Sequence, residues 1–360
     1  MPDLISKTGY SVPFEKLDVE SIQELPRELK NVASLIVDWQ AGKAFFELHT
    51  SGSTGTPKTI QLSRDKIEFS ARLTASTFGL NPGDTLFLCL ETNYVAGFMM
   101  VMRALVIGCN LLVEKSRSNP LKDISADQKI DFASFVPIQM ETMLNDEKAI
   151  GMMNGMKAIL LGGAPVSEAL EEKLQMLKVP VYHTYSMTET YTHVAVRLMN
   201  GAHRNRTYQP LEGVTLSLDE RSCLVISSYI TDHQPLITND IVDIIEDGSF
   251  TWIGRIDNVI NSGGVKMQLE KIETIVGQVF EKLNLKLNFF AAGIPDEKLG
   301  EKLVLVVKGE LSKEMVNNFN DQLSVILGKY AVPKEILFVK EILKTRTGKV
   351  DRIGTMELIV

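Results

Sequence analysis

The sequence of 360 residues is poor in cysteine: it contains only Cys89, Cys109 and Cys223, and no C-x-x-C pair. An odd count without that spacing argues against a disulfide framework and against a zinc site. Each cysteine lies in an apolar run, where a free thiol behaves as a small hydrophobic side chain. We therefore predict three buried free thiols and a reducing compartment, the cytoplasm.

Positive charge and long apolar runs are also scarce. The chain has 38 Lys and Arg against 45 Asp and Glu, a net charge of −7 at pH 7, which argues against nucleic acid or an anionic membrane as the main partner. The longest apolar run, residues 94–113, is interrupted by Arg103 and Asn110, so it predicts a buried helix and strand rather than a membrane insertion. The first ten residues lack the pattern of a signal peptide.

Apolar segments alternate with helical patterns from residue 44 onward. The predicted strands are 44–48, 85–90, 110–115, 131–136 and 156–163, and the predicted helices are 63–80, 95–108, 137–144 and 166–177. Strand and helix repeated at this spacing predict an α/β fold with a helix-covered, mainly parallel sheet. Ligands of such a sheet collect at the carboxyl ends of its strands.

The pattern changes after about residue 200. Short strands at 214–219, 223–228, 240–245 and 249–254 predict an antiparallel β subdomain. From residue 257, helices at 269–283 and 312–327 and strands at 287–294, 302–309 and 335–340 predict a small α+β unit with its own core. We place the boundary between a large domain, residues 1–254, and a mobile C-terminal domain, residues 255–360.

Residues 49–59, HTSGSTGTPKT, combine small hydroxyl side chains with glycines and end in a Pro-Lys pair. Such a loop can wrap a polyphosphate, because glycines let backbone N–H groups approach while hydroxyls donate to phosphate oxygens and lysine supplies countercharge. It is not a Walker loop, because Pro57 stands where the second glycine should be. We predict that it lies between strand 44–48 and the helix that begins at Ser63. The alternative is a Ser/Thr/Gly-rich surface linker. The candidate phosphate ligands are Thr50, Ser51, Gly52, Ser53, Thr54, Gly55 and Lys58.

A second candidate site is the segment YHTYSMTET, residues 182–190. A carboxylate such as Glu189, after Thr188, fits beside a polyphosphate only with a cation between them, and Mg²⁺ prefers carboxylate and phosphate oxygens. Tyr185 could stack on a base. The alternative is a solvated turn with a capping threonine. Further upstream, Gly162 and Gly163 end an apolar strand, where they either let a flat ligand lie close to the backbone or form an ordinary turn.

Two further sites follow in the second half of the chain. Asp240 could accept both hydroxyls of a ribose, and Arg255 could donate to the same sugar or to a phosphate. The alternative is a cap for Asp240 and a surface ion pair with Asp257 for Arg255. Near the end, KTRTGKVDR contains Lys349, which is either a catalytic cation or part of a solvated basic segment.

These segments, taken together and in order from Thr50 to Lys349, resemble the motifs of the adenylate-forming enzymes, a family of acyl-CoA synthetases, adenylation domains and luciferases. The chain departs from the family at Ser186 and Asn239, where glycine is usual, and only 49 residues precede the phosphate loop. The segments 185–201 and 236–267 are most similar to the o-succinylbenzoate–CoA ligases of menaquinone biosynthesis.

The resemblance implies ATP, Mg²⁺ and CoA as cofactors and a small carboxylic acid, most similar to o-succinylbenzoate, as substrate. It implies a nucleotide loop at Gly163 and Ala164, a magnesium ligand at Glu189 and a catalytic lysine at Lys349. It also implies a hinge at Asp257 and a CoA loop at Ser262, Gly263 and Gly264. The implied acyl pocket contains Tyr94, Gly97, Gly162, Gly163, His193 and Arg197, with Arg103 as a more distant cation. Ligation of another aryl or acyl acid, adenylation without CoA, a nucleotide-binding regulator and a homodimer all remain open.

Overall fold

The computed structural model describes residues 2–49, 59–328, 331–344 and 350–359. The chain forms two compact units. The first contains residues 1–216, 226–236 and 246–249, and the second contains 217–225, 237–245 and 250–360. The chain therefore passes between the units several times from residue 216 to 250, and a boundary between 254 and 255 stays a prediction.

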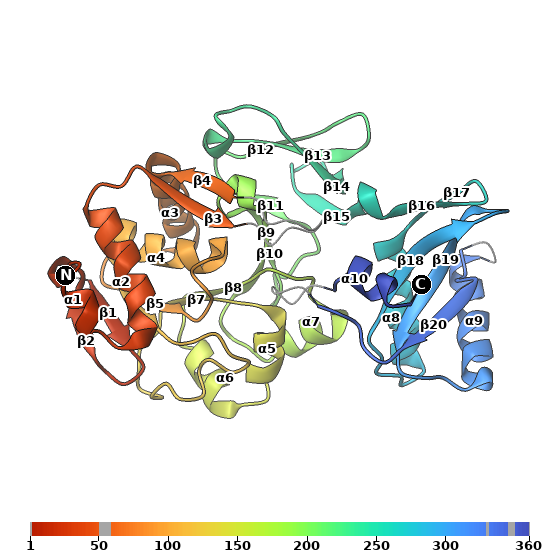
Figure 1. The fold of residues 1–360 in the computed structure, drawn as a ribbon, viewed down its shortest axis with the longest axis horizontal. Coiled ribbons are helices and arrows are strands. Elements are labelled where there is room, and N and C mark those ends of the chain that lie inside the picture. Colours follow the sequence, from red (N-terminus) through yellow and green to blue (C-terminus); the bar gives the residue numbers. More distant parts are fainter. Residues whose placement is uncertain (1, 50–58, 329–330, 345–349, 360) are drawn as a thin grey trace. The chain divides into compact units, whose positions relative to one another are not determined.

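A nine-stranded sheet in the order β11-β10-β9-β8-β7-β5-β6-β1-β2 dominates the first unit (Figure 1). The six strands from β9 to β1 in this order pair in parallel, which confirms the predicted mainly parallel sheet. Both edges of the sheet are antiparallel. The strands are β1 (Asp3–Ser6), β2 (Ser11–Pro13), β5 (Thr85–Leu88), β6 (Asn110–Val113), β7 (Phe132–Phe135), β8 (Ala158–Leu161), β9 (Val181–Ser186), β10 (His193–Leu198) and β11 (Gln209–Pro210).

Helices cover both faces of this sheet (Figure 1). On one face lie α2 (Arg27–Gln40), α3 (Arg64–Phe78) and α4 (Val95–Ile107), and on the other lie α5 (Pro137–Met143), α6 (Glu147–Met153) and α7 (Glu168–Leu174). Helix α4 is apolar nearly all round and is buried from Gly97 to Ala104, including Arg103. A helix of this composition is stable only between other layers, which is where the structure places it. Two short helices, η1 (Phe14–Lys16) and α1 (Ser21–Glu24), precede α2.

The surroundings of residues 49–59 differ from the prediction. The segment does not run from a strand directly into a helix, because β4 (Thr59–Ser63) comes first and pairs antiparallel with β3 (Phe45–His49). Ile60 and Leu62 alternate with polar residues and lie opposite Leu48 and Phe46, which buries one face of this two-stranded sheet. The predicted phosphate ligands between the strands, residues 50–58, lie outside the described residues.

Two sheets supply most of the second unit. The first is β12-β13-β14-β15, with β12 (Thr215–Leu218), β13 (Cys223–Ser227), β14 (Leu236–Ile244) and β15 (Phe250–Arg255), and its last pair is antiparallel, as predicted. The short helix η3 (Tyr229–Thr231) lies between β13 and β14 in sequence.

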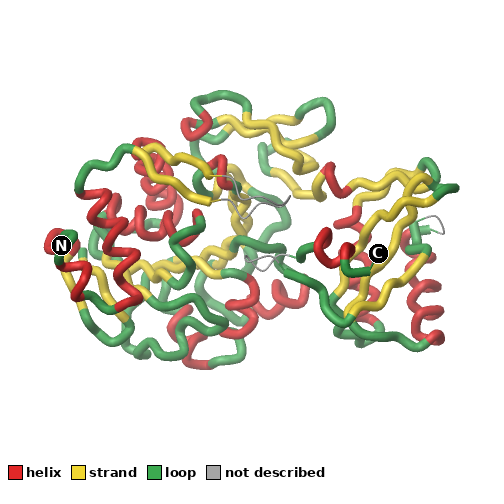
Figure 2. Tube along the Cα trace, in the orientation of Figure 1, coloured by secondary structure: helices red, strands yellow, loops and turns green. Residues whose placement is uncertain are grey.

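The second sheet of this unit has the order β17-β16-β19-β18, with β20 paired to β19 (Figure 2). Helices α8 and α9 pack on one face around Phe280 and Phe319, and α10 contributes Met356 to the core on the other face. The elements are η4 (Ile256–Asn258), β16 (Val259–Ser262), β17 (Val265–Gln268), α8 (Leu269–Lys282), β18 (Phe289–Asp296), β19 (Gly300–Lys308), α9 (Lys313–Leu327), β20 (Glu335–Val339) and α10 (Arg352–Glu357). The predicted small α+β unit is thus present.

Candidate active site

The carboxyl edge of the parallel sheet gathers several predicted site residues of the first unit. Gly162 follows β8, Thr188 follows β9, and Tyr94 lies in the turn after β5. In the parallel pair of β8 and β9, Leu161 lies opposite His183, so the segments that leave these strands begin side by side. The fold therefore brings the Gly-Gly loop and the Thr-Glu turn together, where ligands of a parallel sheet bind.

Gly97 has a packing reason to be glycine. A Cβ at this position would lie 2.4 Å from the backbone oxygen of Glu91, in the turn that precedes α4. The same oxygen accepts a hydrogen bond from the backbone N–H of Tyr94 at 3.2 Å. Gly97 thus lets α4 begin directly against this turn, which fixes where the half-buried Tyr94 lies.

The loop after β8 also requires its glycines. Gly163 has a φ of +83°, a backbone conformation that residues with a side chain rarely adopt. A Cβ at Gly162 would lie 2.7 Å from Oγ1 of Thr184. The Thr184 hydroxyl donates to the backbone oxygen of Leu161 at 3.1 Å. The two glycines therefore let the loop turn closely over β9.

His183 is a functional candidate that the sequence reasoning did not single out, although it lies within the YHTYSMTET segment. Its Nε2 lies 3.2 Å from the backbone oxygen of Ala164, and its Nδ1 lies 2.5 Å from the Tyr208 hydroxyl. A carbonyl can only accept, so Nε2 carries the proton and Nδ1 accepts from Tyr208. Burial lowers the pKa of His183 from 6.5 to about 4 and raises that of Tyr208 to about 12. A neutral His183 thus anchors the loop that contains Ala164.

Arg197 already has a carboxylate partner. Its Nη2 lies 3.0 Å from an oxygen of Glu171 on α7, and its guanidinium lies 5.9 Å from the ring centre of Tyr208. The ring of Tyr185 meets the ring of Tyr208 edge-on, with centroids 6.0 Å apart. Arg197, Tyr185 and the Ala164 loop are therefore joined through Tyr208, and the charge of Arg197 is largely balanced by Glu171.

The Thr188–Thr190 turn, η2, is held in place by the residue that follows it, Tyr191. Tyr191 has a φ of +62°, an uncommon conformation for a bulky residue, and it is buried. Its hydroxyl accepts a hydrogen bond from the backbone N–H of Ser63, at the end of β4, at 3.2 Å. Glu189 is exposed on this turn. The strand that leads out of residues 50–58 is thereby tied to the turn that contains Glu189.

His193 lies in a buried polar cluster rather than on an open wall. Its Nδ1 lies 3.1 Å from Oγ1 of Thr192, and its Nε2 lies 3.4 Å from Oγ1 of Thr74 on α3. Burial, reinforced by the charge of Arg103, holds the pKa of His193 well below its usual range. His193 is therefore neutral and serves as a hydrogen-bonding group in this cluster.

In the second unit, the structure brings together Asp240, Arg255 and Asp257. Trp252 donates from Nε1 to Asp240 at 3.2 Å, and Nη1 of Arg255 lies 3.6 Å from the same carboxylate oxygen. Nη2 of Arg255 lies 2.7 Å from Asp257, which also accepts from the Asn239 amide at 3.0 Å. Asn239, which replaces the glycine usual in the family, thus contacts Asp257, the predicted hinge. The predicted Asp257–Arg255 ion pair is present, and it leaves the guanidinium close to both carboxylates.

The predicted CoA loop is a tight hairpin turn. Ser262 lies opposite Val265 in the pair of β16 and β17, and only Gly263 and Gly264 stand between them. Their φ angles are +60° and +85°, and two consecutive positive φ angles are typical of a type I′ hairpin turn. The backbone N–H of Gly263 also donates to Leu299 at 2.9 Å. Only glycine, asparagine or aspartate fits such a turn without strain.

Lys349 lies outside the described residues, but both flanks of its segment are defined. Lys344 and Val350 form an antiparallel bridge around residues 345–349. Arg352 pairs with Glu273 at 2.8 Å and donates to the backbone oxygen of Ala291 at 3.4 Å. Burial raises the pKa of Glu273, while Arg352 opposes this shift. The residues that follow Lys349 are thus held against α8 and β18 through Arg352.

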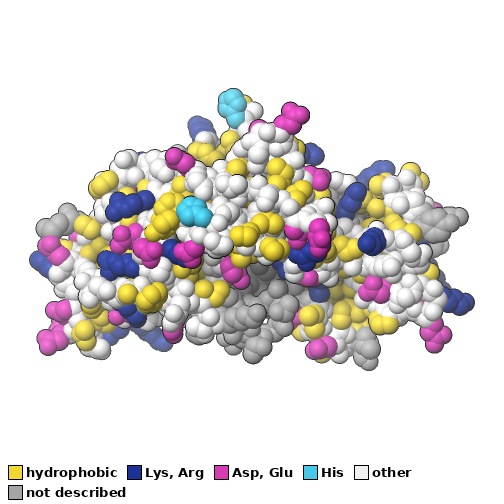
Figure 3. Space-filling model, turned by 90° about the horizontal axis from the view of Figure 1, so that it is seen from above, with side chains coloured by type: hydrophobic (Ala, Val, Ile, Leu, Met, Phe, Trp, Pro, Cys, Tyr) yellow, Lys and Arg dark blue, Asp and Glu magenta, His cyan; other side chains and the backbone are white. Residues whose placement is uncertain are grey.

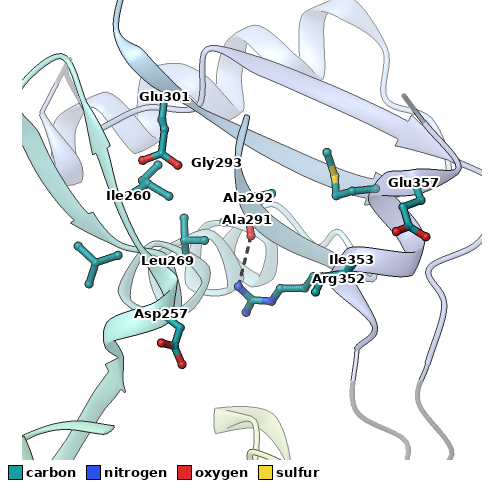
Figure 4. Close-up of a pocket in the computed structure, with 12 residues that line it drawn as sticks. Asp257, Ile260, Leu269, Ala291, Ala292, Gly293, Glu301, Arg352, Ile353 and Glu357 are labelled. Carbon is teal, nitrogen blue, oxygen red and sulfur yellow. Dashed lines mark hydrogen bonds between the residues drawn. The ribbon is translucent and has the colours of Figure 1, made fainter. Parts of the chain in front are cut away.

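A hollow of about 440 Å³ lies beside this anchor (Figure 4). Its wall is mostly apolar, with Ile260 and Leu269 on one side and Ile353 of α10 on another. The side chain of Arg352 reaches across to Ala291, and Asp257 lies at the rim. The predicted hinge and the segment after Lys349 therefore share one surface of the second unit.

Comparison with known proteins identifies the class. The model of the AMP-binding enzyme family matches residues 10–221, and that of the AMP-binding enzyme C-terminal domain matches residues 288–349. The chain belongs to the AMP-binding enzyme family. This confirms the resemblance found in the sequence, and with it the expectation of an enzyme of the AMP-forming acyl-CoA synthetase class.

Individual proteins of this class are similar to the chain over most of its length. A 2-succinylbenzoate–CoA ligase of Lactococcus lactis subsp. lactis is 27% identical over 336 residues, which cover 89% of this chain and 72% of the relative. An acyl-CoA synthetase (AMP-forming)/AMP-acid ligase II-like protein of Dyadobacter fermentans has 37% sequence identity and a TM-score of 0.62, with 94% of this chain and 97% of that chain covered. The o-succinylbenzoate coenzyme A synthetase of Bacillus subtilis, solved with ATP and magnesium, shares the fold at 18% identity and a TM-score of 0.71, covering 85% and 68% of the two chains.

The surface charge and the length of the helices can be compared with the predictions about nucleic acid and membrane partners. On the face seen in Figure 3, acidic and basic side chains are interspersed rather than gathered into a field of one sign. Within the described part of the chain, no helix has both the length and the apolar character needed to cross a bilayer. The three cysteines are free and buried, as predicted.

Proposed function

We propose that this protein is an acid–CoA ligase. A carboxylate oxygen of the acid attacks the α-phosphorus of ATP, forming an acyl-adenylate and releasing pyrophosphate. The sulfur of CoA then attacks the acyl carbonyl, giving up its proton, and AMP leaves. The observation that supports this most strongly is the convergence of the Gly162–Gly163 loop and the Glu189 turn at one sheet edge of an AMP-binding enzyme.

We assign the nucleotide to these groups. The hydroxyls and glycines of residues 50–55, with Lys58, bind the phosphates, Gly163 and Ala164 border the adenine, and Tyr185 stacks on it. Asp240 and Arg255 bind the ribose or a phosphate. Asp240 is 8% exposed and already accepts a hydrogen bond, so its carboxylate is held in place before a ligand arrives. Closing such a site protects a reactive anhydride from water.

Glu189 suits a magnesium ion shared with phosphates. Among the described residues, no three His, Cys, Asp or Glu side chains gather into a metal site, whereas Glu189 is an exposed carboxylate on a fixed turn. Mg²⁺ is commonly bound through one or two carboxylates together with substrate phosphates. When bound, the ion would neutralise charge on the phosphoryl oxygens, and Glu189 would hold it.

The two half-reactions need different groups from the C-terminal part of the chain. Lys349 stabilises charge on the acyl carboxylate and α-phosphate during adenylation. The hairpin of Ser262, Gly263 and Gly264 faces the pantetheine arm during thioester formation. We assign the exchange to a rotation about Asp257, since hinge positions are residues that absorb a backbone change at the end of an element, and Asp257 lies in η4 between β15 and β16.

For the substrate, we propose o-succinylbenzoate, and the names of the curated relatives support this choice. The acid has one carboxylate to activate and a second that must be neutralised or hydrogen-bonded once it is buried. Tyr94, Thr192, His193 and Arg197 are candidates to bind it. Because Arg197 already pairs with Glu171, it can bind a second carboxylate only by sharing its guanidinium.

The test is a coupled assay of pyrophosphate release, with and without CoA, over a panel of aromatic monocarboxylic and dicarboxylic acids. We expect acid-dependent pyrophosphate release, formation of a CoA thioester, and the highest kcat/KM with o-succinylbenzoate. An analogue with hydrogen in place of the ring carboxylate should react much more slowly. Equal kcat/KM for both acids would remove the substrate assignment and leave the ligase, whereas pyrophosphate release without any thioester would favour an adenylation enzyme.

A further inference from the structure

Arg103 is a buried cation without a carboxylate partner. Its side chain lies within α4 and is 2% exposed, yet it forms no ion pair with any acidic residue in the part of the chain that the structure describes. Burial alone lowers its pKa to about 10. Burying a guanidinium without a paired carboxylate lowers the stability of the folded state. A contribution to stability therefore does not explain why an arginine stands at this position.

The guanidinium binds two threonine hydroxyls instead. Nε donates to Thr74 of α3 at 3.2 Å, and Nη2 donates to Thr192 at 2.6 Å. The Thr74 hydroxyl donates in turn to the backbone oxygen of Ser70 at 3.0 Å. The hydroxyl and imidazole hydrogens of the cluster fit a neutral His193, since Thr192 can then donate to its Nδ1 and its Nε2 can donate to Thr74.

Thr192 stands directly after the turn that contains Glu189. Its backbone N–H donates to Thr190 at 2.7 Å, and its backbone oxygen accepts from the Thr190 hydroxyl at 2.7 Å. Between them, Tyr191 has the φ of +62° noted above. A bulky residue keeps such a conformation only where its surroundings fix it, and Arg103 fixes Thr192 on one side while Ser63 fixes Tyr191 on the other.

We propose that Arg103 is a positioning residue of the active site: by holding Thr192, it fixes the Tyr191 turn and thereby the direction in which Glu189 projects. The assignment of Glu189 to a magnesium ion rests on the proposed function. The hold on the turn does not, because it follows from the contacts of Arg103 alone. In this proposal, the buried Arg103 lowers the stability of the fold and at the same time fixes the conformation of the turn.

The experiment compares Arg103→Met with Arg103→Lys and the wild type. Met fills a similar volume without charge and leaves the Thr74 and Thr192 hydroxyls with their other partners. We expect Arg103→Met to unfold at the same or a higher urea concentration than the wild type. Its rate of acyl-adenylate formation should fall roughly 10- to 100-fold, with a higher half-saturating concentration of Mg²⁺. Arg103→Lys should recover part of the rate.

Hydrogen exchange provides a readout that needs no substrate. The backbone amides of Thr190, Tyr191 and Thr192 all donate within the turn, so they should exchange faster in Arg103→Met. The matched control is Lys157→Met, which removes a cation that is paired with Asp84 at 2.6 Å before β8, at the other end of the strands. It leaves a buried carboxylate unpaired, so it should destabilise the fold while the rate per folded molecule is unchanged.

The outcomes separate the two proposals. If the wild type activates no acid, the proposed function fails, while the exchange rates still decide whether Arg103 holds the turn. Wild-type exchange in the turn of Arg103→Met, or wild-type adenylation by it, overturns the role of Arg103. The role is also overturned if Arg103→Met loses activity only in proportion to its loss of folded protein.

Discussion

At the scale of single residues, the site is built from groups whose neighbours set their charge. His183 and His193 are neutral because burial disfavours the imidazolium form, and neither is therefore suited to general acid–base work near pH 7. Arg197 is balanced by Glu171, and Arg103 is balanced by no acid among the described residues. Glu189 is the exposed carboxylate of the Thr188–Thr190 turn, and it is therefore the group that we expect to bind a cation.

Glu189→Gln should raise the Mg²⁺ requirement and slow acyl-adenylate formation, because an amide oxygen lacks the charge that binds the ion. Folding should be unchanged, since Glu189 is exposed. The measurement is a Mg²⁺ titration of pyrophosphate release, with Glu141→Gln on the exposed surface of α5 as the control. A titration curve that coincides with that of the wild type would refute the assignment.

His183 gives a pH dependence of stability. The unfolded chain binds a proton at His183 below pH 6.5, whereas the folded chain binds one only below about pH 4. The stabilisation is therefore complete above pH 6.5 and is lost as the pH falls toward 4. Urea unfolding of the wild type and His183→Gln across this range should show a smaller loss of unfolding free energy in the variant. Parallel curves would contradict the depressed pKa.

At the scale of elements, glycines decide how closely the segments around the site approach one another. Gly97 lets α4 start against the turn at Glu91, Gly162 lets its loop pass over Thr184, and Gly263 and Gly264 close the β16–β17 hairpin. A Cβ at Gly97 or Gly162 would lie within 3 Å of other atoms, whereas Gly264 has open space and needs glycine for its positive φ; only the fold reveals this difference.

Gly97→Ala should destabilise the protein by about 1–3 kcal/mol, because the added Cβ would lie 2.4 Å from the Glu91 backbone oxygen and α4 must shift. Acid activation should fall with it, since the shift moves Tyr94. Gly151→Ala in α6 is the matched control: a Cβ there meets nothing within 4 Å, and the change should stabilise by up to about 1 kcal/mol. Urea unfolding of both variants measures the difference, and equal stabilities would contradict the close approach.

At the scale of the whole molecule, the chain folds into two compact units, and the proposed reaction assigns each half-reaction to a different segment of the second. The hinge proposed at Asp257 lies on the short helix η4, and the Asp257 carboxylate binds Asn239 and Arg255. Both segments, Lys349 and the Gly263–Gly264 hairpin, follow this hinge in the sequence.

Lys349→Ala should slow acyl-adenylate formation by roughly two to three orders of magnitude, on the scale of losing a positioned charge at a transition state. Thioester formation from supplied acyl-adenylate and CoA should persist. Gly264→Ala should give the reverse pattern, with a modest loss of stability from the positive φ at that position. Single-turnover measurements of each half-reaction test this, and equal losses in both steps for both variants would exclude an exchange of segments.

The mainly parallel sheet and the small C-terminal unit could be predicted from the sequence, and the class of enzyme from its resemblance to a known family. These follow from local periodicity and from short motifs, and both are properties of consecutive residues. The other features of the site depend on contacts between residues that are distant in the chain. β4 was missed because its partner strand, not its own five residues, makes it a strand. Arg103 and Arg197 look alike in the sequence as cations near the acyl pocket, but Arg197 pairs with Glu171, whereas Arg103 donates to two threonine hydroxyls. Burial and partnership depend on residues distant in the chain, so the charge balance of the site is set by the fold.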